Sequence, residues 1–250
     1  MKTTTIVLLV LIVNSLLAQT KKAAIGFLYT QKNEITYYGM VPQVVNPPKS
    51  LFSNGSKFTE EIYFDSIKTK IKSILPALGF RLVSEDSIIT KESYKNLIKK
   101  NAPDKTPNDV LANGYAYAAN FGLLFNNDGT DPDVMIEAYG DYTLDLSNLK
   151  GSVTATLVYQ MTIVGYNSKK KKVFVFKTKN NAKNPTKIQV AIKQSNSSPW
   201  GYEIIEDISQ KQIDCLQDAF KRINEDLPEQ IEKTNKFYTC CSNALHLHEP

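Results

Sequence analysis

In this sequence of 250 residues, acid–base chemistry would depend on carboxylates, lysines and tyrosines, because histidines are few and badly placed for it. Both histidines, His246 and His248, lie in the last five residues, so a Ser–His–Asp or Cys–His arrangement would require the C-terminal tail to dock into a cleft. Glu60 and Glu61 are the obvious carboxylate pair, but neighbours in a helix point in different directions and the helix dipole already favours acids in a first turn. An enzyme is consequently the second functional hypothesis, after a non-catalytic binding protein. It would be an exported, hydrolase-like enzyme with two carboxyl groups about 5–10 Å apart.

The glycine spacing excludes phosphate-binding loops. The closest two glycines, Gly122 and Gly129, are seven residues apart, so neither a G-x-G-x-x-G turn nor a P-loop can be written. The acidic run 126–133 resembles a calcium loop, but with Gly129 in the sixth position of an EF-hand, Met135 takes the twelfth position, which needs a Glu. We expect a polar turn between two strands there, and no cofactor.

The cysteines and histidines near the C-terminus leave three hypotheses open. The sequence contains three cysteines, Cys215, Cys240 and Cys241, and this odd number leaves at least one thiol unpaired within a monomer. In an oxidising compartment, Cys215 could form a disulfide with Cys240 or with Cys241, whereas a Cys240–Cys241 bridge would close a strained ring. Thiolate and imidazole also bind zinc or copper, so the tail at 239–250 could hold a metal, form a disulfide, or do neither.

The distribution of charge is the strongest functional signal. The net charge is only +5, from 30 basic and 25 acidic residues. Residues 146–202 nevertheless contain ten lysines and no acid, whereas 126–145 contain six acids and no base, and 203–232 nine acids and three bases. The sequence therefore predicts a strongly basic hairpin between acidic segments.

This basic hairpin has two interpretations. Its turn residues Lys169, Lys170, Lys171 and Lys172, with Trp200 in a nearby loop, could bind an envelope protein or an anionic envelope surface such as lipid head groups or acidic glycans. Alternatively, the hairpin meets the acidic final helix within the fold, or its lysines prevent strand-to-strand aggregation, and Trp200 plugs the core. Nucleic acid is not expected, because no aromatic–basic RNA-binding motif is present.

Residues 1–18 predict a secretory signal peptide. Met1-Lys2 precedes an apolar segment, Ile6–Ala18, of about 13 residues, whereas a membrane-spanning helix needs about 20. We expect an exported protein, periplasmic or secreted, with no transmembrane span and one domain at 19–238. An uncleaved anchor stays open as an alternative.

Two amphipathic helices are expected to position these residues. Ser56 is predicted to cap the first, which ends at Gly79, and Ser209–Gln212 forms a capping box for the last. The expected buried positions of the first are Phe58, Ile62, Ile67, Ile71, Ile74, Leu75 and Leu78, and those of the last are Ile213, Leu216, Phe220, Ile223 and Leu227. A weaker helix is predicted over 91–100, and another is predicted to begin at Thr106-Pro107-Asn108-Asp109.

Apolar and β-branched runs predict strands at 23–29, 80–83 and 121–125, and a long hairpin from 153–166, the turn 167–170 and 173–176. The order strand, helix, strand, helix, strand, hairpin, helix indicates an α/β fold bordering on α+β. We expect a single domain with a mixed sheet, a long hairpin and helices packed on it.

The helix ending in Leu-Gly-Phe-Arg-Leu-Val at 78–83, the later segment 119–125 and the lysine-tipped hairpin follow a family pattern. In this order of elements the chain resembles the periplasmic α/β module of TolB amino-terminal domains, curli secretion-channel lipoproteins and lipoprotein activators of penicillin-binding proteins. It differs in having no lipoprotein Cys and in its long proline-bearing segment, 31–56. The resemblance implies a non-catalytic envelope protein that binds or scaffolds another component.

Overall fold

The structure is a computed structural model that describes residues 21–31, 58–84, 88, 92, 94–95, 109–115, 132–145, 154–179, 185–195, 198–204 and 206–245. The predicted signal peptide, the strand predicted at 121–125 and both histidines lie outside these residues. The described elements are β1 (Lys21–Gln31), α2 (Glu60–Ile74), the 3₁₀ turn η1 (Pro76–Leu78), β2 (Phe80–Leu82), β3 (Asp109–Leu111), β4 (Val134–Asp145), β5 (Thr154–Tyr166), β6 (Lys172–Lys179), β7 (Thr186–Ser195), β8 (Ser198–Ile204) and α5 (Ser209–Leu245).

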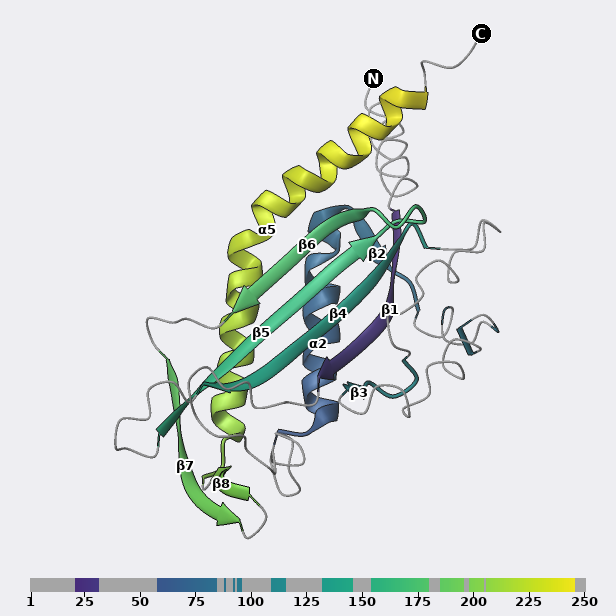
Figure 1. Ribbon diagram of the computed structural model, residues 1–250. Helices are drawn as coiled ribbons and strands as arrows, with labels where there is room; N and C mark the ends of the chain where they lie inside the picture. Colours follow the sequence, from purple (N-terminus) through teal and green to yellow (C-terminus); the bar gives the residue numbers. More distant parts are fainter. Residues whose placement is uncertain are drawn as a thin grey trace, which may run out of the picture.

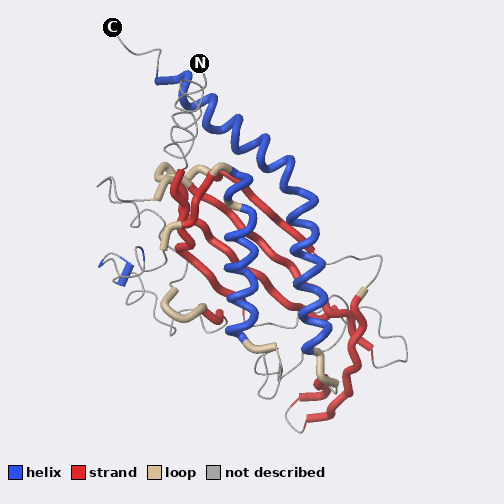
Figure 2. The backbone as a smooth tube through the Cα atoms, turned by 180° about the vertical axis from the view of Figure 1, so that it is seen from behind, coloured by secondary structure: helices blue, strands red, loops and turns tan. Residues whose placement is uncertain are grey.

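The strands form a mixed sheet in the order β2-β1-β4-β5-β7-β8, with β3 also paired to β1 and β6 to β5 (Figure 1). β1 is parallel to β2 and β4, and the β4–β5 and β5–β6 pairs are antiparallel. Helices α2 and α5 lie side by side on one face of the sheet (Figure 2). The predicted mixed sheet with a long hairpin and helices packed on it, in a single domain, is thus confirmed.

Strand β5 pairs with two different strands, β6 and β7, along its edge opposite β4. Its C-terminal half, Gln160–Tyr166, pairs with β6, and its first residues, Thr154–Leu157, pair with β7 on the same edge. The β5–β6 turn and the β7–β8 pair consequently lie at opposite ends of the sheet (Figure 1).

Helix α2 follows the predicted amphipathic pattern with two differences. Thr59, not Ser56, is the N-cap, and its hydroxyl accepts the Ile62 N–H at 3.3 Å. Ile62 itself is 47% exposed, although the other predicted core positions are buried. At the end of η1, Gly79 takes the left-handed conformation with φ 80°, which a residue with a Cβ adopts only with strain. The predicted stop at Gly79 is confirmed.

Helix α5 starts and ends differently from the prediction. The capping box is wrong, because Asp207 accepts both the backbone N–H and the hydroxyl of Ser209, and the Gln212 N–H goes to the Ile208 carbonyl. The helix continues to Leu245 and so includes 239–245 of the expected tail. It bends near its middle (Figures 1 and 2), where Pro228 removes one backbone donor.

The core lies between the two helices and the sheet. Its centre is a group of fully buried aromatic rings, Tyr63 on α2, Tyr142 on β4 and Tyr159 on β5. The Tyr63 hydroxyl donates to the Gly140 carbonyl at 2.9 Å and lies 3.1 Å from the Tyr159 hydroxyl. Gly140 admits this arrangement because it has no Cβ. Burial raises the pKa of all three phenols, so they are neutral hydrogen-bonding groups of the core.

Two further local predictions are wrong. Asp109, expected in the first turn of a helix, begins β3, which pairs with Tyr29–Gln31 at the end of β1. Pairing of this backbone with a sheet edge outweighs the local Thr-Pro signal. Trp200, expected in a loop, belongs to β8, because residues 198–204 pair with β7.

A disulfide from Cys215, one of the three hypotheses for the C-terminal cysteines, does not form within this fold. Cys215 is buried and in no disulfide, and its thiol donates a hydrogen bond to the Thr186 hydroxyl at 3.4 Å. The backbones of Cys240 and Cys241 belong to the same helix. At 1.5 Å per residue, the 25 residues from Cys215 to Cys240 correspond to about 37 Å, whereas Cα atoms of a disulfide lie within about 7 Å.

Candidate functional site

The turn between β5 and β6 presents four lysines on a rigid frame. The Asn167 side-chain oxygen accepts the backbone N–H of Lys169 at 3.1 Å and that of Lys171 at 2.9 Å. The Lys170 N–H donates to the Asn167 carbonyl, and the Asn167 N–H to the Lys171 carbonyl. Lys170 takes a left-handed conformation with φ 58°. These bonds fix the backbone, while Lys169, Lys170, Lys171 and Lys172 are all exposed.

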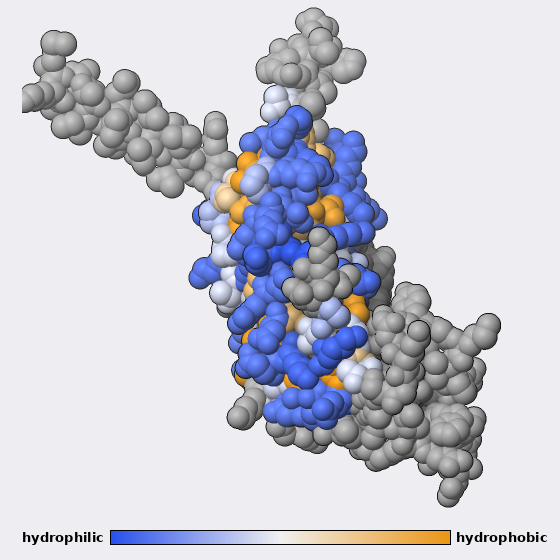
Figure 3. Space-filling view, turned by 90° about the vertical axis from the view of Figure 1, so that its left-hand side faces the viewer, coloured by the Kyte–Doolittle hydropathy of each residue, from blue (hydrophilic) through white to orange (hydrophobic). Residues whose placement is uncertain are grey.

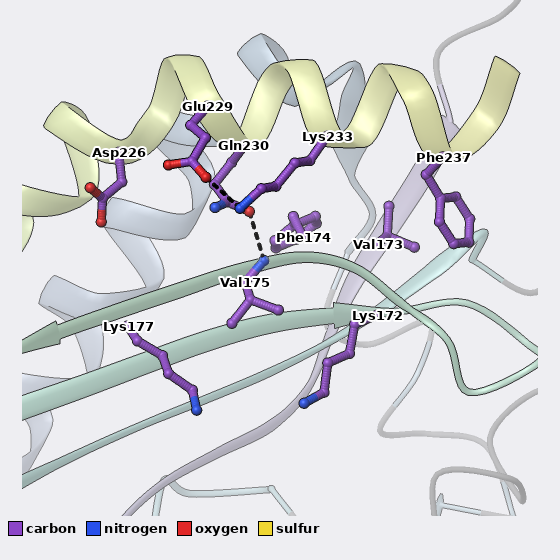
Figure 4. A pocket seen from close by; sticks show the side chains of 10 residues that line it. All are labelled: Lys172, Val173, Phe174, Val175, Lys177, Asp226, Glu229, Gln230, Lys233 and Phe237. Carbon is purple, nitrogen blue, oxygen red and sulfur yellow. Dashed lines mark hydrogen bonds and ion pairs between the residues drawn. The ribbon is translucent and has the colours of Figure 1, made fainter. Parts of the chain in front are cut away.

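A β-bulge at the start of β6 sets the direction of Lys172. The pairing with β5 shifts between Gly165 and Tyr166, so that Val173 and Phe174 are buried in succession. The extra residue changes the alternation of side chains. Lys172 consequently points away from α5, whereas Val173 lies on the side of α5 (Figure 4). Lys177 also points away from α5, through the regular alternation of β6.

Four acids of α5 pair with bases near them in sequence. The ion pairs on this helix and at its start are Lys211–Glu206 (2.7 Å), Lys221–Glu225 (3.9 Å), Arg222–Asp218 (3.1 Å), Lys233–Glu229 (2.5 Å) and Lys236–Glu232 (2.6 Å). Within the described part of the chain, none of the four turn lysines makes such a pair. β6 does pack against α5, but the turn lysines are not neutralised by it.

A groove of about 470 Å³ runs between β6 and α5 (Figure 4). Val173, Phe174 and Phe237 form its apolar part, and Asp226, Glu229 and Lys233 its polar part. Figure 3 looks onto the side of the molecule where β6 and α5 lie; hydrophilic residues dominate its described surface, and hydrophobic ones show as small separate patches.

The outer edge of β6 meets this groove. The Val175 N–H points away from β5 and donates to the Gln230 side-chain oxygen at 3.1 Å. Gln230 is 7% exposed, so α5 uses a nearly buried amide to satisfy one backbone group of an edge strand. Sequence reasoning did not identify Gln230, because its partner lies 55 positions away.

Glu137 is a nearly buried carboxylate that sequence reasoning also missed. Its two oxygens accept the hydroxyls of Tyr29 at 2.9 Å and Tyr166 at 3.3 Å, and it is 7% exposed. Burial raises the pKa of Glu137, opposed by the two phenols and by the positive charge of Lys172. Burial and the neighbouring Glu137 charge raise the pKa of Tyr166 to about 12. A Glu inside the apolar run of β4 was the available signal.

The other residues singled out in the sequence are not brought to this place. Trp200 is on β8, at the opposite end of the sheet from the lysine turn, so the two do not form one surface. Glu60 and Glu61 are exposed on the first turn of α2. The side chains of Cys240 and Cys241, like both histidines, fall outside the described residues. Among the residues that are described, no group of three metal-binding side chains occurs.

A second groove, of about 490 Å³, lies between α2 and α5 and explains the exposure of Ile62, which lines it with Phe220 and Lys70. The Lys70 ammonium donates to the Asn224 side-chain oxygen at 2.5 Å and lies 5.8 Å from the centre of the Phe220 ring. Burial lowers the pKa of Lys70. Of the described residues that line this groove, Asp65 is the one acid, so these residues do not supply the carboxylate pair that the hydrolase hypothesis needs.

No protein-family model and no curated protein matches this sequence. In the described portion, no helix combines the length and the apolar character needed to cross a membrane.

Proposed function

We propose that this protein is an exported, non-catalytic binding module that attaches to an anionic component of the cell envelope through Lys169–Lys172. The observation that carries the proposal is the lysine turn itself. Four exposed cations stand on a turn fixed by Asn167, and no described acid lies within ion-pair distance of them.

The rigid frame matters because a single exposed ion pair contributes only about 0.2–1 kcal/mol. Several cations held on one backbone can contact a multiply charged partner together, with less ordering cost than a flexible segment would incur. Positive charge concentrated at one end of the sheet also accelerates association with an anionic surface. The expected signal peptide at 1–18 and the resemblance to envelope modules support the exported location.

The test is retention on immobilised dextran sulfate, a polyanion used as the probe, at low and high salt. Lys170→Glu/Lys171→Glu should reduce both the retention and its dependence on salt. The matched control is Lys72→Glu/Lys221→Glu, which changes the net charge equally at exposed positions on α2 and α5. An equal loss of retention in both variants would show that only the net charge matters, and it would contradict a defined binding site.

The variant Asn167→Ala examines the frame separately. It keeps all four lysines but removes the acceptor of the Lys169 and Lys171 backbone N–H groups. We expect retention between that of the wild type and that of the charge-reversed variant. Retention equal to the wild type would show that the rigidity of the turn contributes nothing.

A further inference from the structure

We propose that the outer edge of β6 is the docking site for an extended, acidic segment of a partner protein, which adds to the sheet as a further strand. This inference rests on the proposed function and specifies its partner class. The site consists of the β6 edge, the groove against α5, and the lysines that line the strand.

The edge has unused backbone groups in a regular row. Among the described strands, β6 pairs with β5 alone. In an antiparallel pair the backbone N–H and C=O of alternate residues point to the same side. Since the Val175 N–H points outward to Gln230, the groups of Lys177 and Lys179 point outward too. Neither has a backbone partner on that side among the described residues.

The Gln230 side chain takes the hydrogen-bonding place that the first residue of such a strand would occupy. Its side-chain amide places an acceptor 3.1 Å from the Val175 N–H, where the carbonyl of an added strand would lie. The groove beside it is about 470 Å³ in volume. An incoming strand therefore needs to displace one amide hydrogen bond, and it gains those of Lys177 and Lys179.

The charges define the chemistry of the segment. Lys177 and Lys179 are exposed, and Lys172 and Lys177 project from the face of the sheet opposite α5 (Figure 4). Side chains of an added strand alternate between the two faces. Those on the lysine side are expected to be acidic. Those facing α5 are expected to be apolar, because they meet Phe237 and the acids Asp226 and Glu229 that line the groove. A second copy of β6 is disfavoured, because lysines would face lysines.

The test uses a fluorescein-labelled peptide of alternating Glu and Val, equal to β6 in length at 8 residues, with fluorescence anisotropy as the measure of binding. A control peptide with Pro in place of each Val has the same charge but cannot form a strand ladder. We expect at least tenfold weaker binding of the Pro peptide. The variant Lys177→Glu/Lys179→Glu should bind the Glu–Val peptide more weakly than the wild type does, whereas Gln230→Ala should not weaken this binding.

Hydrogen exchange identifies the bound place directly. At saturating Glu–Val peptide, the backbone amides of Lys177 and Lys179 should become protected, whereas that of Thr178, which points towards β5, should not change. Equal binding of both peptides, or no protection at Lys177 and Lys179, overturns strand addition. Protection of these amides that rises with protein concentration in the absence of peptide also overturns it, in favour of a second copy.

Dextran sulfate separates this inference from the proposed function. If the wild type binds dextran sulfate in a Lys170- and Lys171-dependent way but not the Glu–Val peptide, the docking site is refuted and the anion-binding turn stands. If it binds neither, both are refuted.

Discussion

Replacing Gly140 with Ala tests the aromatic core most directly. An added Cβ would lie 2.6 Å from the Tyr63 hydroxyl oxygen and 2.9 Å from Cζ of Tyr159, and nearer still to the Tyr159 hydroxyl. Both rings are fully buried, so neither can swing out of the way without opening the interface between α2 and the sheet.

The expected magnitude has two parts. Overpacking a tight core costs about 1–3 kcal/mol. Moving the Tyr63 hydroxyl off the Gly140 carbonyl removes one buried hydrogen bond, although Thr30 still donates to that carbonyl, and the net loss of one such bond is about 0.5–1.5 kcal/mol. We therefore expect Gly140→Ala to lower the free energy of unfolding by about 1.5–4.5 kcal/mol. With a urea m-value of about 2–3 kcal/mol/M, the midpoint of unfolding should fall by about 0.5–2 M.

A double-mutant cycle distinguishes this steric cause from a general loss of glycine. Tyr159→Phe removes the oxygen closest to the added Cβ and by itself should cost about 1 kcal/mol. If the clash is the cause, the double variant should be more stable than the sum of the two single effects by 1 kcal/mol or more, about the coupling seen between residues in contact. Additive effects, or a Gly140→Ala variant as stable as the wild type, would refute the reasoning.

Two further predictions concern Glu137 and Cys215. Because burial raises the pKa of Glu137 above its ordinary 4.5, the folded state binds the proton more tightly than the unfolded state, and stability falls as the pH rises from 4.5 through the folded-state pKa. The variant Glu137→Gln should not show this fall in the urea midpoint of unfolding across that pH range. Parallel curves of midpoint against pH for the wild type and the variant would contradict the assignment to Glu137. Cys215 is 2% exposed, so iodoacetamide should alkylate it only in urea. Its recovery in a disulfide-linked peptide from the native protein would contradict its place in α5.

The helix–sheet framework was accessible from the sequence because its signals are local. The spacing of Ile67, Ile71 and Ile74 in α2, the stop at Gly79 and the run 154–166 each depend on neighbours within a few turns or one strand. Such periodicity reflects which face of an element is buried, whatever its partner. The lysine turn was accessible for the same reason, since Asn167 and the lysines lie within six positions of each other.

The strands for which the sequence predicted no bounds, β4, β7 and β8, show the limit of this signal. β4 is buried on both faces over much of its length and contains Glu137 and Gly140, so it shows neither alternation nor an unbroken apolar run. β7 and β8 are recognisable as strands only through their pairing with each other and with β5.

The sequence by itself determined the local elements, the glycine stop and the concentration of lysines between acidic segments, because these are properties of neighbouring residues. Only the tertiary structure decided what those elements do to one another. It separated Trp200 from the lysine turn, placed Cys215 far from Cys240 on one helix, and joined Glu137 to Tyr29 across 108 positions. The bulge beside Tyr166 turned Lys172 away from α5. These outcomes depend on sheet register and helix placement, which are fixed by contacts between distant segments and leave no local pattern.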